Sequence, residues 1–274
     1  MVFRLLHCTF VSINGKGIMK KYILDLRVCS VERQNDRYVL IKLTDDQPLP
    51  QMVPGQFVEV RIDDSPTTFL RRPISINNVD ASTNQLWLLV AAAGEGTRRL
   101  TQIEVGQKLN CVLPLGRGFT LPVSPEQHCL LVGGGVGVAP LFYLGRMMSQ
   151  MGVRPVFLLG SRTASDQLEL DLFRELGEVC LTTEDGSLGE KGFVTNHSVL
   201  QRSFDIIYTC GPKPMMMAVA RYARQAGIAC EASLENLMAC GLGACLCCVE
   251  KTTGGNLCVC KEGPVFDKKR LLWD

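Results

Sequence analysis

The spacing of apolar residues divides the chain into two regions with different patterns. In the first region, short segments alternate between apolar and polar residues, as half-buried strands do, at residues 22–28, 37–43, 56–62 and 85–90. Turn-forming residues such as Pro54 and Gly55 lie between these segments. The pattern predicts an antiparallel β-barrel or sandwich that contains one short helix after Thr97.

In the second region the apolar runs are continuous and alternate with helix-like segments. The runs lie at residues 129–132, 156–160, 179–183 and 205–209, and the helical patterns at 140–151 and 167–176. Such an alternation indicates a parallel sheet covered on both faces. From Cys230 onward neither pattern continues. We therefore expect a multidomain chain with an extension at 1–18, a β-barrel domain at 19–122, an α/β domain at 123–229 and a small segment at 230–274.

Composition and charge exclude several classes of protein. With 46% apolar residues in 274, the chain has enough material for buried cores, so it is not disordered as a whole. Its net charge of +2 gives no electrostatic case for binding nucleic acid or an anionic membrane. No apolar run reaches the roughly 18 residues of a spanning helix, and the first residues lack the features of a signal peptide. We expect a cytoplasmic protein.

The cysteines are the most informative residues of the tail. Seven of the 13 lie in the last 45 residues, at positions 230, 240, 245, 247, 248, 258 and 260. In a reducing compartment, clustered thiols are more often metal ligands than disulfides. The spacing of Cys240, Cys245 and Cys248, followed by Cys260, is that of a plant-type two-iron cluster. A tetrahedral zinc site, for instance from Cys245, Cys248, Cys258 and Cys260, is the alternative.

Two segments of the first region have residues suited to a phosphate-bearing flavin. One combines an arginine, whose fork can bind phosphate, with a rigid proline and a small hydroxyl donor, in Arg72, Pro73, Ile74 and Ser75. The other offers close backbone approach to a pyrophosphate and a possible helix cap, in Gly94, Gly96 and Thr97. Taken alone, either segment is more consistent with an ordinary turn and solvated arginines than with a flavin site.

Two segments of the second region suit a dinucleotide. The glycine-rich turn with Gly135 and Gly137 lies between a buried strand and a helix, although Pro140 departs from the common glycine pattern. Cys210, Gly211 and Pro212 follow another apolar strand, and the carboxyl ends of parallel strands line the ligand crevice. Cys210 is thus either next to a nicotinamide or a small buried core residue.

Taken together and in this order, the segments resemble the ferredoxin–NADP reductase-like family of flavoproteins. Within it, residues 235–245 and 260–266 resemble the electron-transfer subunits of class 1B dihydroorotate dehydrogenase. The resemblance implies FAD, a [2Fe–2S] cluster and NAD as cofactors. It implies that Ser75 and Cys210 lie at the reacting rings, and it gives the cluster ligands as Cys240, Cys245, Cys248 and Cys260.

The resemblance also implies a function and a partner. An FMN-containing dihydroorotate dehydrogenase subunit would supply electrons, which pass through the cluster and FAD to NAD+ in pyrimidine biosynthesis, within a heterotetramer of two of each chain. Arg162 follows the second strand of the α/β region, where an arginine can accept a 2′-phosphate, so NADP is an alternative to NAD. The other hypotheses are a subunit of a sulfide dehydrogenase or of an NADH-dependent ferredoxin–NADP+ oxidoreductase, and a zinc-bearing interaction module.

Overall fold

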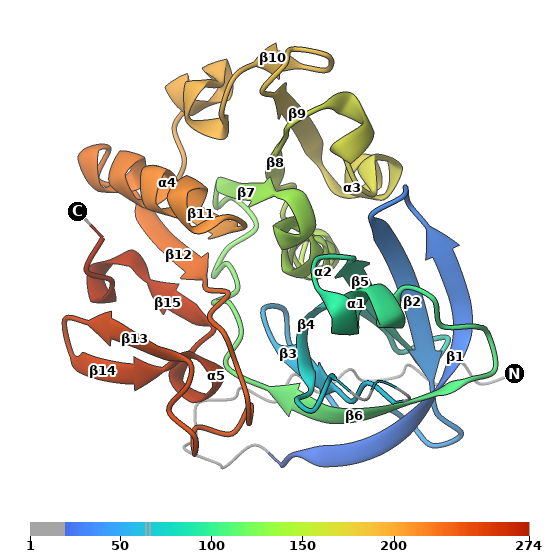
Figure 1. Ribbon diagram of the computed structural model, residues 1–274. Helices are drawn as coiled ribbons and strands as arrows, with labels where there is room; N and C mark the ends of the chain where they lie inside the picture. Colours follow the sequence, from blue (N-terminus) through green and yellow to red (C-terminus); the bar gives the residue numbers. More distant parts are fainter. Residues whose placement is uncertain (1–19, 64, 66, 274) are drawn as a thin grey trace, which may run out of the picture.

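The first part of the chain forms a closed barrel. The computed structural model describes residues 20–63, 65 and 67–273 (Figure 1); the predicted extension at 1–18 lies outside them. Six strands pair antiparallel in the order β1-β2-β5-β4-β3-β6. They are β1 (Tyr22–Arg33), β2 (Tyr38–Thr44), β3 (Phe57–Val60), β4 (Arg72–Asp80), β5 (Gln85–Ala91) and β6 (Lys108–Leu115), with helix α1 (Glu95–Leu100) between β5 and β6. The predicted barrel is thereby confirmed.

The second part is a seven-stranded sheet in the order β10-β9-β8-β7-β11-β12-β15. Its strands are β7 (Cys129–Gly134), β8 (Val156–Ser161), β9 (Glu178–Thr183), β10 (Glu190–Lys191), β11 (Ile206–Cys210), β12 (Ala229–Ser233) and β15 (Val265–Asp267). All pairs are parallel except β12–β15. Its helices are α2 (Val138–Gln150), α3 (Leu170–Leu176) and α4 (Lys213–Gln225). Short 3₁₀ turns are η1 (Gly135–Gly137), η2 (Ala164–Asp166), η3 (Val194–Asn196), η4 (Ser198–Gln201) and η5 (Lys268–Arg270).

Burial on both faces explains why the strands of this sheet are continuously apolar. In β7, Leu131 belongs to the core that contains α2 and α3, whereas Leu130 and Val132 face the core that contains α4. Alternate side chains of a strand point to opposite faces, so a sheet covered by helices on each side needs apolar residues at every position. The predicted parallel sheet is confirmed.

The cysteine-rich tail adds a hairpin, β13 (Val249–Thr252) with β14 (Gly255–Cys258), and the short helix α5 (Val259–Glu262). Strands β12 and β15 both belong to the seven-stranded sheet, so the sheet crosses the predicted domain limit at residue 229. Cys248 and Cys260 are buried in one core with Phe57 of β3 and Met216 of α4. The tail is therefore packed between the barrel and the sheet, as Figure 1 shows at the lower left.

The barrel and the sheet share a packed interface formed mainly by α2 and β4. Tyr143 of α2 donates a hydrogen bond to the carbonyl oxygen of Met52 at 3.0 Å. Phe142 stacks against Trp87 of β5, with ring centroids 6.3 Å apart. Among the described residues, none of the helices has the length and apolar character needed to cross a membrane.

The structure also corrects local expectations. Helix α1 begins at Glu95, before Thr97 rather than after it. Strands β4, β6, β12 and β15 are absent from the prediction. The β4 sequence carries two arginines, a proline and two asparagines in and beside it, which hide the alternation of a strand.

Candidate functional site

One cavity of about 660 Å³ gathers most of the predicted flavin residues. Five of them line it, namely Arg72, Pro73, Ile74, Ser75 and Thr97. It is also lined by Val136 of the glycine turn, by Ala139 in the first turn of α2 and by residues 233–238, which lead into the cluster loop. The barrel, the sheet and the tail thus meet around a single cavity.

Local packing fixes the arginine of this cavity. A β-carbon at Gly96 would lie 2.7 Å from Nε of Arg72, so the absence of a side chain there makes room for the guanidinium. Arg72 also donates to the carbonyl oxygen of Leu70 at 2.7 Å. The neighbouring Arg71 donates instead to the carbonyl oxygen of Asn110 at 2.8 Å, which ties it to the barrel. Arg71 is thus bound to the carbonyl oxygens of the barrel, whereas Arg72, the predicted phosphate ligand, makes fewer contacts with them.

Thr97 shapes the second flavin segment differently from the prediction. It is the third residue of α1, and its hydroxyl oxygen accepts hydrogen bonds from the backbone N–H groups of Ala93 and Gly94, both at 3.0 Å. The hydroxyl therefore reaches back to cap the turn that precedes the helix. Gly94 is exposed, and a β-carbon added to it would meet no atom within 4 Å. The backbone at Gly94 is therefore accessible to a ligand.

A second cavity, of about 540 Å³, lies at the carboxyl ends of the parallel strands. It is lined by Gly134 and Gly135 of the glycine turn and by Pro212. Gly135 has φ +55°, a conformation that glycine adopts without strain. The turn brings backbone amide groups to the edge of the sheet where nucleotides bind in open α/β folds.

The two predicted nucleotide motifs pack directly against each other. A β-carbon at Gly137 would lie 2.5 Å from both Cα and N of Gly211, so only glycine allows this approach. Pro140 lies in the first turn of α2, where the missing N–H costs no intrahelical hydrogen bond. Pro140 is buried in the helix and lines neither cavity.

The glycine turn is a common wall of both cavities. Gly134 and Gly135 line the nucleotide cavity, and Val136 of the same turn lines the flavin cavity together with Ala139 of α2. The two cavities are therefore adjacent, and hydride transfer would require the two rings to meet in direct contact, about 3–3.5 Å apart, where the cavities join.

Backbone amides point at the sulfur atoms of the tail. Leu242 N–H donates to Sγ of Cys240 at 3.3 Å, and Gly243 N–H donates to Sγ of Cys260 at 3.1 Å. Cys260 N–H in turn donates to Sγ of Cys248 at 3.4 Å. Burial acts to raise the pKa of Cys240, but the amides of the loop outweigh it and lower the pKa to about 6. The amide contacts favour the thiolate of Cys240, the form that binds iron, whereas burial and the neighbouring Cys248 raise the pKa of Cys260.

The conformation of the loop also suits a bound cluster. Gly241 and Gly243 have φ of +64° and +80°, and Leu246, next to Cys245, has φ +59° although it carries a side chain. Within residues 20–63, 65 and 67–273, no group of three or more metal-binding side chains surrounds a single point. The spacing of the four cysteines suits a two-iron cluster, in which two thiolates bind each iron.

Relatives of known name carry the same combination of parts. Residues 235–272 match the family model of the iron-sulfur cluster binding domain of dihydroorotate dehydrogenase B. The chain is 43% identical over 221 residues to the dihydroorotate dehydrogenase B (NAD(+)), electron transfer subunit, of Shouchella clausii, with 78% of this chain and 84% of that one covered. The chain belongs to this family of electron transfer subunits. The subunit of the same name from Bacillus mycoides is 40% identical over 268 residues, with 93% and 95% covered.

Solved structures agree with this family. A chain in the structure of an NADH-dependent reduced ferredoxin–NADP oxidoreductase, described in work on flavin-based electron bifurcation, superposes with a TM-score of 0.81 at 25% identity, covering 96% of this chain and 92% of that one. The ferredoxin reductase in carbazole 1,9a-dioxygenase has a TM-score of 0.66 at 22% identity, with 77% and 68% covered, and so shares the fold. The predicted resemblance is confirmed.

In this electron transfer subunit, Cys210 lies behind the cavities rather than in them. It is fully buried at the end of β11, and its Sγ is 3.9 Å from Oε1 of Glu235, which lines the flavin cavity. Burial raises the pKa of Cys210 well above its ordinary value, and the nearby carboxyl raises it further. Burial raises the pKa of Glu235 as well. The role of Cys210 at a nicotinamide stays a prediction.

Sequence reasoning does not single out Glu235 as a residue of the site. A lone carboxyl has no characteristic spacing, but Glu235 follows the carboxyl end of β12, which is the edge of the sheet where ligands bind. Cys247, which is outside the set of predicted cluster ligands, also lines the flavin cavity. Cys258 has its Sγ 4.0 Å from the carbonyl oxygen of Gly243, near the loop but likewise outside that set.

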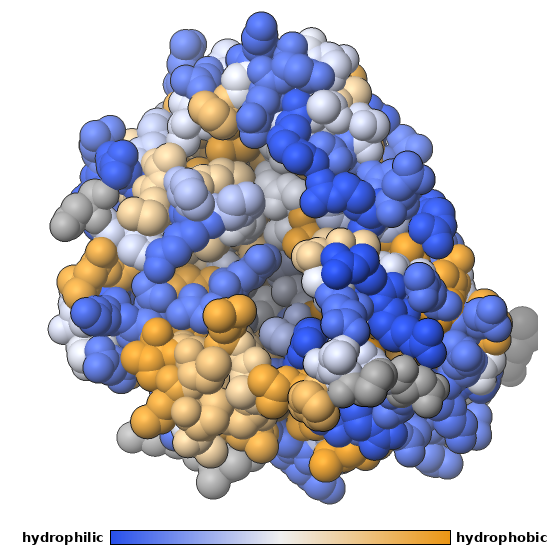
Figure 2. Space-filling view, in the orientation of Figure 1, coloured by the Kyte–Doolittle hydropathy of each residue, from blue (hydrophilic) through white to orange (hydrophobic). Residues whose placement is uncertain are grey.

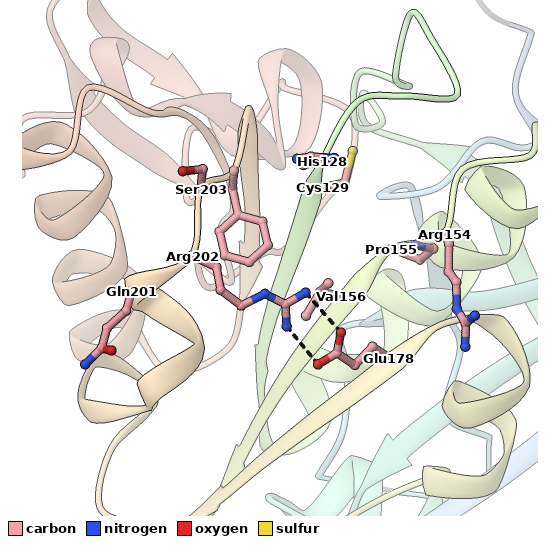
Figure 3. A pocket seen from close by; sticks show the side chains of 10 residues that line it. His128, Cys129, Arg154, Pro155, Val156, Glu178, Gln201, Arg202 and Ser203 are labelled. Atoms are coloured by element: carbon pink, nitrogen blue, oxygen red, sulfur yellow. Dashed lines mark hydrogen bonds and ion pairs between the residues drawn. The ribbon is translucent and has the colours of Figure 1, made fainter.

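Another cavity, of about 830 Å³, lies at the opposite edge of the sheet (Figure 3). It is lined by residues at the amino ends of β7, β8 and β9, among them Cys129, Val156 and Glu178. Glu178 accepts two hydrogen bonds from the guanidinium of Arg202, at 2.8 and 3.0 Å, so these charges neutralise each other. The position and the paired charges separate this cavity from the cofactor sites.

Proposed function

We propose that this chain passes electrons from an FMN-containing dihydroorotate dehydrogenase subunit through a [2Fe–2S] cluster and FAD to NAD+. The observation that carries the proposal is the order of the sites. The nucleotide and flavin cavities share the glycine turn, and residues 233–238 form a wall of the flavin cavity just before the first cluster cysteine, Cys240. A two-electron acceptor, a flavin and a one-electron centre would thus follow one another across the molecule.

Each cofactor has residues suited to hold it. The Arg72 guanidinium and the backbone around Gly94 and Thr97 suit the phosphates of FAD, and the hydroxyl of Ser75 suits the flavin ring. In the proposal, Gly135 and Pro212 contact the nucleotide, Gly137, Gly211 and Pro140 shape the turn behind it, and the cluster ligands are Cys240, Cys245, Cys248 and Cys260. The proposed limits are 19–122 for FAD, 123–229 for NAD and 230–274 for the cluster.

The residues of this chain bind and orient rather than exchange protons. When bound, the flavin can take electrons singly from the cluster and give two together, with a proton, to NAD+. Half-buried Ser75 would orient the flavin ring and the glycine turn would orient the nucleotide so that the two rings can come into contact, and Leu89, Ala91 and Val136 contribute apolar surface to the flavin cavity. Exclusion of water from this cavity would prevent loss of electrons to other acceptors.

Electrons would enter from a partner at the cluster loop. The side chains of Leu237, Leu242 and Leu246 are 84%, 48% and 63% exposed in and beside this loop. Figure 2 shows an apolar area over the tail, at the lower left of the view. An apolar patch of this kind is typical of a protein interface. We propose that the FMN subunit binds here, in a heterotetramer of two of each chain, in the cytoplasm, where the free thiols of the described residues would stay reduced.

The first test is the absorption spectrum of the protein purified without air, with FAD, iron and acid-labile sulfide measured on the same sample. We expect flavin bands near ~450 nm and a broad iron–sulfur shoulder that dithionite bleaches. Reduction by dihydroorotate when the FMN subunit is added would support the assigned partner. A colourless protein that takes up zinc, and neither FAD nor iron and sulfide on reconstitution, would refute the proposal.

A second test concerns Ser75. Replacing it by alanine removes one hydroxyl from the flavin cavity without adding volume, so FAD should remain bound while hydride transfer slows by about tenfold or more. Stopped-flow reduction of the flavin by NADH, beside the FAD content of both proteins, measures the two effects separately. An unchanged rate of flavin reduction would exclude a role for Ser75 in the transfer.

A further inference from the structure

Three charged side chains meet at one end of the nucleotide cavity. Arg162 follows β8 and Glu184 follows the neighbouring strand β9, and both line the cavity together with Asp166. Ser161 pairs with Thr183 across the two strands, and Glu184 N–H donates to the carbonyl oxygen of Ser161 at 3.1 Å. The ends of two adjacent strands therefore bring Arg162 and Glu184 to the same edge of the sheet, and the turn η2 adds the carboxyl group of Asp166.

Asp166 forms an ion pair with Arg162, the arginine that could otherwise bind a phosphate. Nη2 of Arg162 lies 3.4 Å from Oδ2 of Asp166, four residues further along the chain. The side chain of Asp166 is only 16% exposed, whereas that of Arg162 is 63% exposed. The carboxylate is therefore the fixed member of the pair, and the guanidinium is the member that has room to move.

The loop that carries Asp166 is tied down at several points. The side-chain amide of Gln167 donates to the carbonyl oxygens of Leu159 and Thr182, at 3.4 and 3.3 Å. The side-chain amide of Asn35, in the barrel, donates to the carbonyl oxygen of Ser165 at 2.8 Å. A carboxylate on such a loop cannot easily swing away when a ligand enters the cavity.

The charge at this edge distinguishes the two nicotinamide nucleotides. The cavity is lined by Arg37 and Arg162 and by the two carboxyl groups, so its side-chain charges cancel before a nucleotide enters. A ribose hydroxyl can donate to a carboxylate, whereas a 2′-phosphate would add about two negative charges close to Asp166 and Glu184, where Arg162 is already paired with Asp166. An exposed ion pair contributes little by itself, so the discrimination would come from this repulsion.

We propose that Asp166, together with Glu184, determines the specificity of the nucleotide cavity for NAD over NADP, Asp166 by holding Arg162 and both by repelling a 2′-phosphate. The inference rests on the proposed function, because it takes this cavity as the nicotinamide nucleotide site. Arg162 alone would suggest a site for the 2′-phosphate of NADP, and its pairing with Asp166 reverses that expectation.

The test compares four variants with the wild-type holoprotein. They are Asp166→Asn, the double variant Asp166→Asn/Glu184→Gln, the same double variant with Arg162→Ala, and Asp171→Asn as a matched control. Asp171 pairs with Arg174 on the exposed surface of α3 at 2.9 Å, outside the cavity. Two quantities are measured for each protein. One is the affinity for AMP and for adenosine 2′,5′-bisphosphate by titration calorimetry, and the other is the kcat/KM ratio of NADH to NADPH with ferricyanide as acceptor.

The wild type should prefer AMP and NADH. The double variant should shift both ratios toward the 2′-phosphorylated ligands by about tenfold or more, with the gain weakening at high salt. Adding Arg162→Ala should remove the gain, because the released guanidinium is what binds the phosphate. A shift below about twofold, or an equal shift in Asp171→Asn, would overturn the inference while leaving the proposed function intact. A wild type that binds neither nucleotide would overturn both.

Discussion

In both the glycine turn and the cluster loop, backbone groups rather than side chains would face a ligand. Different contacts fix the conformation of the two segments. Gly133 and Gly137 of the turn are buried, and Gly137 packs against the backbone of Gly211, which directly follows the neighbouring strand β11. In the loop between Cys240 and Cys248, Leu242 and Leu246 are exposed, and the described contacts of the thiols are mostly hydrogen bonds from neighbouring amides. The turn is thus shaped by the core of the sheet, whereas we expect the loop to depend on its metal.

The largest effect should follow from changing a ligand of the cluster loop. Replacing Cys260 by serine should reduce bound iron and acid-labile sulfide to near zero, because four thiolates are needed to hold the two irons. Electron transfer from the partner should stop, while FAD stays bound and NADH still reduces ferricyanide, since the turn does not depend on the cluster. Iron and sulfide analysis, electron paramagnetic resonance of the reduced protein and the ferricyanide assay measure these outcomes.

Two neighbouring thiols provide matched controls. Cys258→Ser and Cys247→Ser remove a sulfur within two residues of a proposed ligand, and both should keep a full complement of iron. If Cys258→Ser loses the cluster and Cys260→Ser keeps it, the fourth ligand has been assigned to the wrong residue. If Cys260→Ser also loses NADH oxidation, the nucleotide site at the glycine turn depends on the cluster loop. The contrast between the two segments is then wrong.

The next largest effect should follow from adding one carbon to the glycine turn. In Gly137→Ala, the new β-carbon would lie 2.5 Å from backbone atoms of Gly211, and backbone cannot yield as a side chain can. We expect a loss of about 3 kcal/mol of stability and at least about tenfold weaker NADH binding, with iron unchanged. Urea unfolding and NADH titration measure both quantities.

A glycine in an open turn gives the control for this variant. Gly254 lies between β13 and β14, where the nearest atom to a β-carbon would be 3.8 Å away, so Gly254→Ala should alter neither stability nor NADH binding measurably. Normal NADH binding by Gly137→Ala would mean that the turn adapts, and that packing against Gly211 does not shape the nucleotide site.

The same contrast explains what could be predicted from the sequence. The proposed cluster ligands and the glycine turn have short, local spacings, so Cys240, Cys245, Gly135 and Gly137 can be singled out as candidates without a structure. The strands around the turn are equally visible, because burial on both faces makes them continuously apolar.

Other features depend on contacts between distant segments. Glu235, the Asp166–Arg162 pair and the packing of Gly96 under Arg72 bring together residues whose individual positions form no recognisable pattern. Strand β15 joins the sheet through an antiparallel pairing with β12, more than 30 residues earlier, which no local periodicity indicates. The predicted helix position near Thr97 was wrong because the cap reaches backward from inside the helix.

The smallest expected effect concerns a polar contact between the barrel and the sheet. Glu169 precedes α3 with only 8% of its surface exposed, and its Oε2 accepts a hydrogen bond from the side-chain amide of Asn77, on β4, at 2.8 Å. Its Oε1 is buried and has no hydrogen-bond partner among the described residues. Burial raises the pKa of Glu169 to about 7, with the Asn77 bond acting against it, and Glu32 and Lys42 act as more distant charges. The folded protein therefore holds a proton on Glu169 that the unfolded chain releases at lower pH.

The sign of the pH dependence follows from this difference. Between the unfolded pKa near 4.5 and the folded pKa near 7, the folded state binds more protons, so the free energy of unfolding should fall as the pH rises through this window, by at most about 3 kcal/mol. Burial raises the pKa of Glu59 to about 7 as well, so the wild-type curve contains both carboxyl groups.

Glu169→Gln should match the wild type at pH 5 and exceed it at pH 8, whereas Glu175→Gln, an exposed carboxyl on α3, should leave the curve unchanged. Urea unfolding of the three holoproteins from pH 5 to 8 measures the difference, and parallel curves for wild type and Glu169→Gln would show that Glu169 is ionised throughout this range.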